Sequence, residues 1–366
     1  MNLLRGLPRG LMTRLERYIA IATLKALLLV SAGLTILFSL LELVNQLHDV
    51  GKGSYRLIDA CVYVLLTAPA RLLELMPAAM LFACLFALGA LATRAELTVM
   101  RASGISPNLI VGAVFKLALA ILVALFVLAQ FVIPPAQQLA QSERDSRLAS
   151  FGAVRGSNSF WAAGDHQFLN VRGFADANIP VDIYLYEFSA GGEVRGVIQA
   201  ARAEVRADGT WLLERVSRKR FSGTQIDTEQ LATLLWHSFL RPAQVSLLTL
   251  PADSMRPLDL YRYVRDLERR HQPAARYAQE LWAKIDLPLA MAAMILIALP
   301  FAFGSLRTRG MGQRMMIGTM IGIIFTLVQQ ITSYLGLLLN VSPVLTATTP
   351  SIVLIALGVY LFRRAV

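Results

Sequence analysis

Apolar and polar stretches alternate along the chain, and six of the apolar stretches are long enough to cross a membrane as helices. About 20 apolar helical residues span the roughly 30 Å hydrocarbon core of a bilayer. Three stretches precede a long polar segment and three follow it. The predicted spans are Ile19–Leu41, Leu72–Ala92, Asn108–Ile133, Leu287–Leu306, Met315–Leu339 and Val344–Phe362. The pattern predicts an α-helical membrane protein with six transmembrane helices in a 3+3 arrangement.

The polar segment, residues 136–272, has a different periodicity. Its clearest run, Val181–Phe188, alternates apolar and polar residues as a half-buried strand does. Asp208-Gly209 separates two further strand-like runs, which is typical of a hairpin. We expect an inserted all-β domain of the sandwich or open-barrel class, ending in an amphipathic helix over Pro257–Gln272. The expected domains are residues 1–135, 136–272 and 273–366.

Composition supports the membrane assignment, and charge predicts the orientation. The chain is 56% hydrophobic, with a mean hydropathy of +0.55, well outside the soluble range. Its net charge is +11, but residues 136–272 are nearly neutral, with 17 basic and 16 acidic residues. The excess lies in arginines that flank the spans: Arg5, Arg9, Arg14, Arg17, Arg94, Arg101, Arg307, Arg309, Arg314, Arg363 and Arg364. The positive-inside rule then places both termini in the cytoplasm and the β domain in the periplasm. Topology, and not nucleic-acid binding, explains the basic charge.

Sequence signals for catalysis, metal binding and disulfides are weak or missing. Cys61 and Cys84 are the only cysteines, and the β domain contains neither. The four histidines show no metal-ligand spacing, and no phosphate-binding loop of the Gly-x4-Gly-Lys-Ser/Thr type occurs. We therefore predict no catalytic residue, no metal site and no cofactor bound by this chain. The spans also lack deep ionisable residues, which disfavours a proton-coupled carrier.

The loop Thr93–Pro107 between the second and third spans has the pattern of a short surface helix. Ser103-Gly104 is expected to end that helix, and Ser106-Pro107 is expected to begin the third span. A short helix parallel to the membrane suits docking of a cytoplasmic partner. On physical grounds alone, a plain interhelical loop fits the pattern equally well.

Polar side chains gather at the predicted outer ends of the first and fifth spans. A lipid-facing surface would not carry such groups unpaired, so they indicate either a cavity or gate, or interfacial anchoring. They are Ser39, Glu42, Asn45 and Gln46 in the first span, and Gln329, Gln330, Thr332 and Ser333 in the fifth.

Several motifs along the whole chain resemble those of one family. They are Gln46-Leu47 with Gly51-x-Gly53-Ser54-Tyr55, then Glu96-Leu97-Thr98-Val99-Met100-Arg101-Ala102-Ser103-Gly104, Trp282-x-Lys284-x3-Pro288-Leu289, Phe303-Gly304-x-Leu306-Arg307 and Met311-Gly312-x-Arg314. On these residues the chain resembles the LptF/LptG family of lipopolysaccharide-export permeases, most closely its LptG side.

The resemblance implies an ABC transporter in the inner membrane of a Gram-negative bacterium. Its parts would be this permease, a homologous LptF-like permease and a cytoplasmic LptB-like ATPase dimer that uses ATP and Mg. The transporter would extract lipopolysaccharide from the outer leaflet of the inner membrane. It would pass the lipid to periplasmic LptC/LptA-like β-jellyroll proteins, and the β domain of this chain would be jellyroll-like.

The resemblance also implies two sets of site residues. Residues 93–104 would be the coupling helix, and its ATPase contacts would be Arg94, Glu96, Leu97, Met100 and Arg101. The lipid cavity or gate would include Glu42, Asn45, Gln46, His48, Lys52, Arg144, Gln329 and Gln330.

One departure from the family concerns the lipid phosphates. Family members often carry lysines at the outer end of the first span, where this chain has Glu42, Asn45, His48 and Asp49. Among nearby cations, Arg144 is the preferred phosphate ligand, because a guanidinium matches phosphate oxygens well. A topological or solubility role would explain a surface arginine equally well.

Two rival functions belong to other classes. A mechanotransmission or scaffold membrane protein would also combine few spans, a periplasmic domain and a separate ATPase, but would move no lipid. A secondary carrier would transport without any nucleotide-binding partner.

Overall fold

A computed structural model describes residues 13–149, 160–164, 167–175, 179–189, 193–206, 209–222, 225–238, 254–269, 274–303, 311–339 and 341–365. The chain forms two compact units. A helical unit comprises Met1–Asn45, Val64–Ala136 and Arg256–Val366, and a second unit comprises Gln46–Tyr63 and Gln137–Met255. Arg5, Arg9, Arg307 and Arg309, used above to predict orientation, lie outside the described residues.

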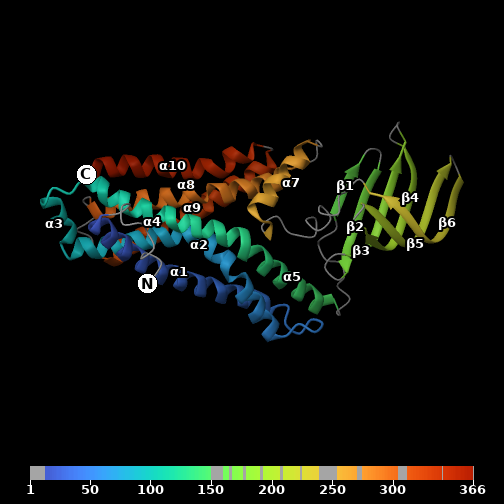
Figure 1. Ribbon diagram of the computed structural model, residues 1–366, viewed down its shortest axis with the longest axis horizontal. Helices are drawn as coiled ribbons and strands as arrows, with labels where there is room; N and C mark the ends of the chain where they lie inside the picture. Colours follow the sequence, from blue (N-terminus) through green and yellow to red (C-terminus); the bar gives the residue numbers. More distant parts are fainter. Residues whose placement is uncertain are drawn as a thin grey trace. The chain divides into compact units, whose positions relative to one another are not determined.

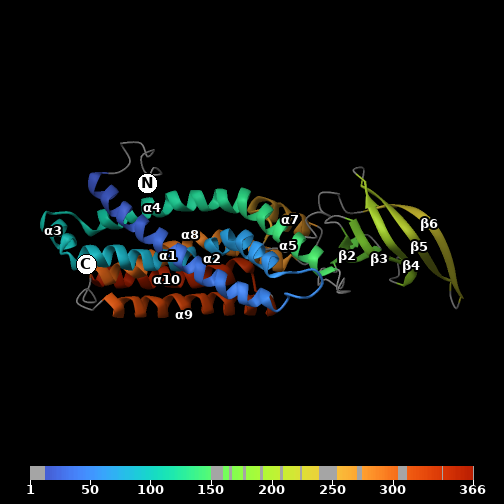
Figure 2. The same ribbon diagram turned by 90° about the horizontal axis from the view of Figure 1, so that it is seen from below.

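Among the described residues, six helices are long and apolar enough to cross a membrane, as the hydropathy pattern predicts. Helix α4 continues through a π-helical turn, η1, into α5, which makes one long rod (Figure 1). A seven-residue helix, α3, joins α2 to α4 at one end of the bundle (Figure 2). The bounds are α1 Arg14–Leu47, α2 Leu57–Thr93, α3 Glu96–Ala102, α4 Pro107–Val127, η1 Leu128–Val132, α5 Ile133–Ala149, α8 Ala275–Phe303, α9 Met311–Leu338 and α10 Pro343–Ala365.

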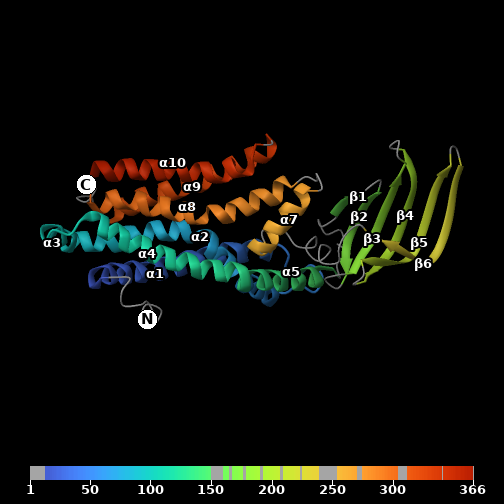
Figure 3. The same ribbon diagram turned by 45° about the horizontal axis from the view of Figure 1, so that its top comes forward.

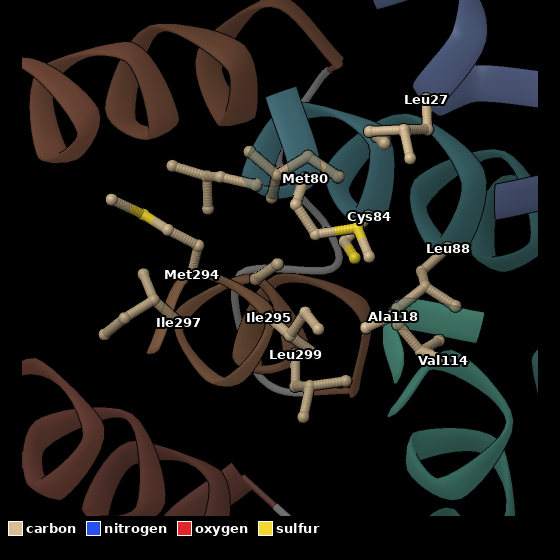
Figure 4. Close-up of a cluster of buried hydrophobic side chains, with 14 of the residues drawn as sticks. Leu27, Met80, Cys84, Leu88, Val114, Ala118, Met294, Ile295, Ile297 and Leu299 are labelled. Carbon is tan, nitrogen blue, oxygen red and sulfur yellow. The ribbon is translucent and has the colours of Figure 1, made fainter. Parts of the chain in front are cut away.

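Helices α2 and α8 form the centre of the helical unit. In their most apolar windows 67% and 61% of residues are buried, against 11% for α1 and 17% for α9. Figure 4 shows the packed side chains, with Met80 and Cys84 of α2 facing Met294 and Ile295 of α8. Because a membrane supplies no hydrophobic force between helices, close packing of this kind holds the bundle together. Helices α1 and α9 are therefore peripheral elements on a tight centre.

Two glycines let α9 approach α2 closely. A Cβ added at Gly318 would meet Leu85, and one at Gly322 would lie 3.9 Å from Leu81 Cδ2. The two glycines are four residues apart and share one helix face, so small residues line this contact as they do in many membrane helix pairs.

The described part of the insert folds as an antiparallel sheet of six strands in sequence order (Figure 3). The predicted all-β insert is confirmed, and Gly209 lies between β4 and β5 with φ +85°, while Asp208 of the predicted turn lies outside the described residues. Among the described residues the strands form one sheet, and not the two packed sheets of a sandwich. The strands are β1 Phe160–Gly164, β2 Gln167–Ala175, β3 Ile179–Phe188, β4 Val194–Val205, β5 Thr210–Ser222 and β6 Gln225–His237.

One face of the sheet carries a continuous apolar cluster. Leu169, Ile183 and Leu185 are nearly inaccessible, and Trp211 packs edge-to-face on Trp236 with ring centroids 5.6 Å apart. The cluster accounts for the alternation in the sequence, because side chains two apart on a strand share a face. After β6, the predicted amphipathic helix is present as α7, Pro257–Arg269.

Candidate functional site

Helix α3 is short because the chain breaks at both of its ends. Ala95, with φ 58°, is in the left-handed conformation, which separates α2 from α3. At the other end Gly104 takes φ +83°, a conformation that glycine adopts without steric cost. Ser106 is extended, and Pro107 opens α4. The predicted short helix is present, and it ends at the predicted Ser103-Gly104, whereas the sequence analysis did not mark the break at Ala95.

The predicted coupling residues divide between the two faces of α3. Leu97 is 2% exposed, and Met100 packs against the apolar core, so these two anchor α3 to the bundle. Arg94 and Arg101 are exposed. Glu96 accepts a hydrogen bond of 2.8 Å from the Tyr18 hydroxyl of α1, and its Oε1 lies 4.0 Å from Arg94 Nη1. The accessible surface of α3 and the turn before it thus carries one carboxylate between two arginines, together with the exposed Thr98 and Val99.

A second polar group joins the end of α1 to α5, within the second unit. Asp49 lies at its centre, with its two oxygens 2.7 Å from Lys52 Nζ and 2.6 Å from Arg144 Nη2. Arg144 Nε also donates to Gln46 Oε1 over 3.2 Å, and the Arg144 guanidinium stacks 5.8 Å from the Tyr63 ring centroid. Lys52 and Arg144 hold the pKa of the Asp49 carboxyl below its usual range. We call Gln46, Asp49, Lys52 and Arg144 the Asp49 cluster.

The Asp49 cluster brings together three of the predicted cavity residues: Gln46, Lys52 and Arg144. It also changes the account of Arg144, because that side chain is engaged by an acidic neighbour and is not an uncommitted surface cation. Two cations share one carboxylate, so the cluster keeps a net positive charge. Asn45 and His48 are exposed beside it in the sequence.

Glu42, also predicted for the cavity, contacts a different element. Its Oε1 lies 3.7 Å from Arg71 Nη2 of α2, within the helical unit. Arg71 further donates to the backbone oxygen of Val64 over 3.2 Å. Charged groups in apolar spans pair with one another or with backbone carbonyls, and this pair does both.

The two predicted glutamines of α9 point in different directions. Gln330 is exposed, whereas Gln329 is partly buried and donates over 3.2 Å to Asp286 Oδ2 of α8. The Ser351 hydroxyl of α10 donates to the same oxygen over 2.6 Å, and Asp286 is fully buried. Asp286 thereby joins α8, α9 and α10.

A second polar contact links the same three helices. Gln279 of α8 donates to Ser333 Oγ over 3.0 Å and accepts from Thr346 Oγ1 over 2.8 Å. Gln279 and Asp286 are two helical turns apart, so both contacts lie on one face of α8.

The sequence analysis missed Asp286, because this residue comes just before the predicted span Leu287–Leu306. The apolar span of α8 is Ala275–Phe301 and includes Asp286, so the prediction that the spans lack deep ionisable residues is wrong for α8. The spacing of Gln279 and Asp286 was a signal that could have found it.

None of the polar clusters described above has the side chains of a metal site. Within the residues that the structure describes, no group of three or more His, Cys, Asp or Glu side chains could hold a metal ion.

Comparison with known proteins places these features in a family context. Residues 17–364 match the model of the family described as lipopolysaccharide export system permease LptF/LptG. The lipopolysaccharide export system permease protein LptG of Haemophilus influenzae is 30% identical over 351 residues, which cover 96% of this chain and 98% of that protein. LptG of Escherichia coli strain K12 is 29% identical over 352 residues, with the same two coverages.

Proposed function

Because the chain belongs to the lipopolysaccharide export system permease family LptF/LptG, and is a multi-pass membrane protein most like LptG, we propose that it works as one permease of an ATP-driven transporter. The transporter extracts lipopolysaccharide from the outer leaflet of the inner membrane. It delivers the lipid to a periplasmic β-jellyroll bridge leading to the outer membrane. The family match over almost the entire chain is the observation that carries this proposal.

ATP is hydrolysed by a separate cytoplasmic ATPase dimer, which docks on α3. The geometry of α3 supports this role, since Leu97 and Met100 anchor the helix while Glu96 remains partly accessible between Arg94 and Arg101. A displacement of α3 must move the bundle, because the helix is continuous in sequence with both α2 and α4 through short turns.

A homologous permease covers the peripheral helices α1 and α9. Both expose long apolar faces, which include Ile36 and Leu40 of α1 and Ile324 and Ile331 of α9. Lipid or a partner helix can cover such faces in a membrane. The polar groups at the same ends of these helices, Glu42 and Gln329, are held inward by Arg71 and Asp286.

The Asp49 cluster contributes the charge that receives the lipid phosphates. A phosphate replaces Asp49 as the partner of Arg144 and Lys52, since it offers more acceptor oxygens to the same two cations. The orientation that this requires, with the cluster on the periplasmic side and the termini in the cytoplasm, is supported by the arginines that flank α3 and close the chain.

The test is reconstitution of the complex purified from membranes of its own host. Proteoliposomes loaded with lipopolysaccharide are mixed with ATP and a soluble β-jellyroll acceptor, and lipid captured by the acceptor is measured. ATP-dependent capture supports the proposal. ATPase activity with no captured lipid would instead favour the mechanotransmission function, and lipid capture without an ATPase subunit would favour a carrier.

A further inference from the structure

Helix α1 is held to the helical unit along one narrow stripe. Its buried positions in this half recur three or four residues apart, so they share one face; they are Glu16, Ile19, Ala20, Thr23, Leu27 and Ser31. Most of the remaining surface is exposed, because only 11% of the most apolar window of α1 is buried. Few packing contacts therefore oppose a change in the tilt of this helix.

A groove separates α1 from α2 at the end of the bundle that carries α3. It has a volume of about 300 Å³. Alanines from both helices line its walls, and their short side chains leave the space open. The lining residues include Ala22 and Ala26 of α1, Ala87 and Ala90 of α2, and Tyr18 and Arg94.

Polar contacts hold the end of α1 beside this groove. Glu16 forms a capping box with Thr13, through bonds of 2.7 and 3.3 Å, and its other oxygen lies 2.6 Å from Lys116 Nζ of α4. The Tyr18 hydroxyl donates to Glu96 of α3 over 2.8 Å. The Tyr18–Glu96 hydrogen bond connects α1 to the accessible surface of α3, because Glu96 is the carboxylate on that surface.

We propose that Tyr18 is a positioning residue for coupling, whose hydrogen bond to Glu96 transmits a displacement of α3 to α1. This inference rests on the proposed function, and it adds a connection to α1 besides the covalent ones to α2 and α4. As a helix of 34 residues, α1 is about 51 Å long. A shift at Tyr18 therefore reaches the far end of α1, where Glu42 pairs with Arg71.

The groove makes this motion possible. Movement of α1 towards α2 narrows a space lined by four alanines and by the larger side chains of Leu29, Phe86 and Leu91. Of these three, Leu29 and Phe86 are exposed. The narrow buried stripe acts as the line about which α1 tilts, and the Glu16–Lys116 pair fixes its position along the bundle. Each turnover of the ATPase on α3 then changes the tilt of a helix at the lipid cavity.

The experiment uses the complete reconstituted complex and the variant Tyr18→Phe. This change removes the hydroxyl but keeps the ring that lines the groove. We expect a roughly three- to tenfold loss in lipopolysaccharide released per ATP hydrolysed, the size expected for a lost hydrogen bond to a charged group that is partly exposed to solvent. Tyr360→Phe is the matched control, because it removes the hydroxyl of a 60% exposed tyrosine on α10.

A second measurement reports on the position of α1 directly. In a Cys61→Ser background, Ala26→Cys puts a thiol in the groove, and its rate of maleimide labelling is compared with and without a non-hydrolysable ATP analogue. We expect a nucleotide-dependent rate with Tyr18 and a nucleotide-independent rate with Tyr18→Phe.

The outcomes separate this inference from the proposed function. If the complex with Tyr18 releases no lipid on ATP addition, the proposed function fails. If that complex works and Tyr18→Phe keeps both its lipid-to-ATP ratio and its nucleotide-dependent labelling, the coupling role of Tyr18 is overturned. If Tyr18→Phe lowers ATPase activity and lipopolysaccharide release equally, so that the lipid released per ATP is unchanged, the coupling role of Tyr18 is overturned as well.

Discussion

The buried hydrogen bond between Ser351 of α10 and Asp286 of α8 allows us to predict how much this contact contributes to the free energy of unfolding. Both side chains are fully buried, and the Ser351 hydroxyl donates over 2.6 Å to Asp286 Oδ2. Asp286 Oδ1 is buried and has no hydrogen-bond partner among the described residues. Removal of the serine hydroxyl therefore leaves the carboxyl with Gln329 as its remaining partner in the structure as described.

We expect Ser351→Ala to lower the free energy of unfolding by about 1–2 kcal/mol. A hydrogen bond to a charged group contributes about 1.5–3 kcal/mol in water-soluble proteins. Contributions measured inside membrane proteins are smaller, at most about 1.7 kcal/mol, because the unfolded helices also find polar partners. The expected range is centred on the overlap of these two ranges, about 1.5–1.7 kcal/mol, since the contact is short and fully enclosed.

A double-mutant cycle isolates the contact from the packing of each side chain. Asp286→Leu removes the carboxyl, so Ser351→Ala in that background should cost less than about 0.5 kcal/mol. The assay is equilibrium unfolding of the purified complex in mixed micelles, with Thr349→Ala as a control at an exposed threonine of the same helix. Equal effects of Ser351→Ala in the two backgrounds would refute the argument, because they would mean that the hydroxyl does not act through Asp286.

Four further predictions concern other parts of the chain. Glu96→Lys reverses the charge on the accessible face of α3 and should abolish ATP-dependent release while the two permeases still copurify, which a pull-down of the partner permease checks. Asp49→Asn removes the acidic competitor for Arg144 and should lower the lipopolysaccharide concentration that half-maximally stimulates the ATPase by about three- to tenfold; an unchanged value would exclude phosphate binding there. The lowered pKa of Asp49 means that the cluster stabilises the fold above the ordinary carboxyl pKa, and that this stabilisation is lost as the pH falls through the lower, folded-state pKa. The free energy of unfolding contributed by the cluster should therefore persist at pH 5. A loss of stability between pH 7 and 5 that occurs with Asp49 and not with Asp49→Asn would contradict this prediction. Gly318→Leu places a branched side chain against Leu85 and should impair docking of α9, seen as loss of assembled complex, whereas Gly312→Leu, at an open position near the start of α9, should have little effect.

The sequence predicted the helices and α3 well, for a clear physical reason. A bilayer requires an unbroken apolar run, so hydropathy alone locates a span. Local signals located the end of α3 and the start of α4, because Ser103-Gly104 and Ser106-Pro107 restrict the conformation of their own backbone and need no distant partner. The all-β nature of the insert followed from Val181–Phe188, whose alternation reflects a sheet with one buried face.

The strand-by-strand pattern of the insert was harder to read because the sheet contains irregularities. In β4 the buried residues Ile198 and Ala200 are two apart, but the next one is Ala203. The neighbouring strands have left-handed residues at the same level, Asp182 in β3 and Arg215 in β5. Each irregularity shifts which residues face inward, so a strict period of two fails along β4 and β5.

The partners of the polar side chains could not be predicted, because they depend on contacts between distant segments. Arg144 and Asp49 are 95 residues apart, and no local pattern states that they meet. The same holds for Tyr18 and Glu96, which are 78 residues apart. The family resemblance identified Glu96 and Arg144 as candidates, and only the fold showed that each is already engaged.

The most direct test of the central claim is the lipid-to-ATP ratio of the reconstituted complex with and without a working α3. The account predicts ATP-dependent capture of lipopolysaccharide by a β-jellyroll acceptor with the unaltered chain. With Glu96→Lys in the same assembled complex, it predicts capture no higher than the level without ATP. Capture that proceeds equally in both complexes would contradict the claim that this chain couples ATP hydrolysis to lipid export through α3.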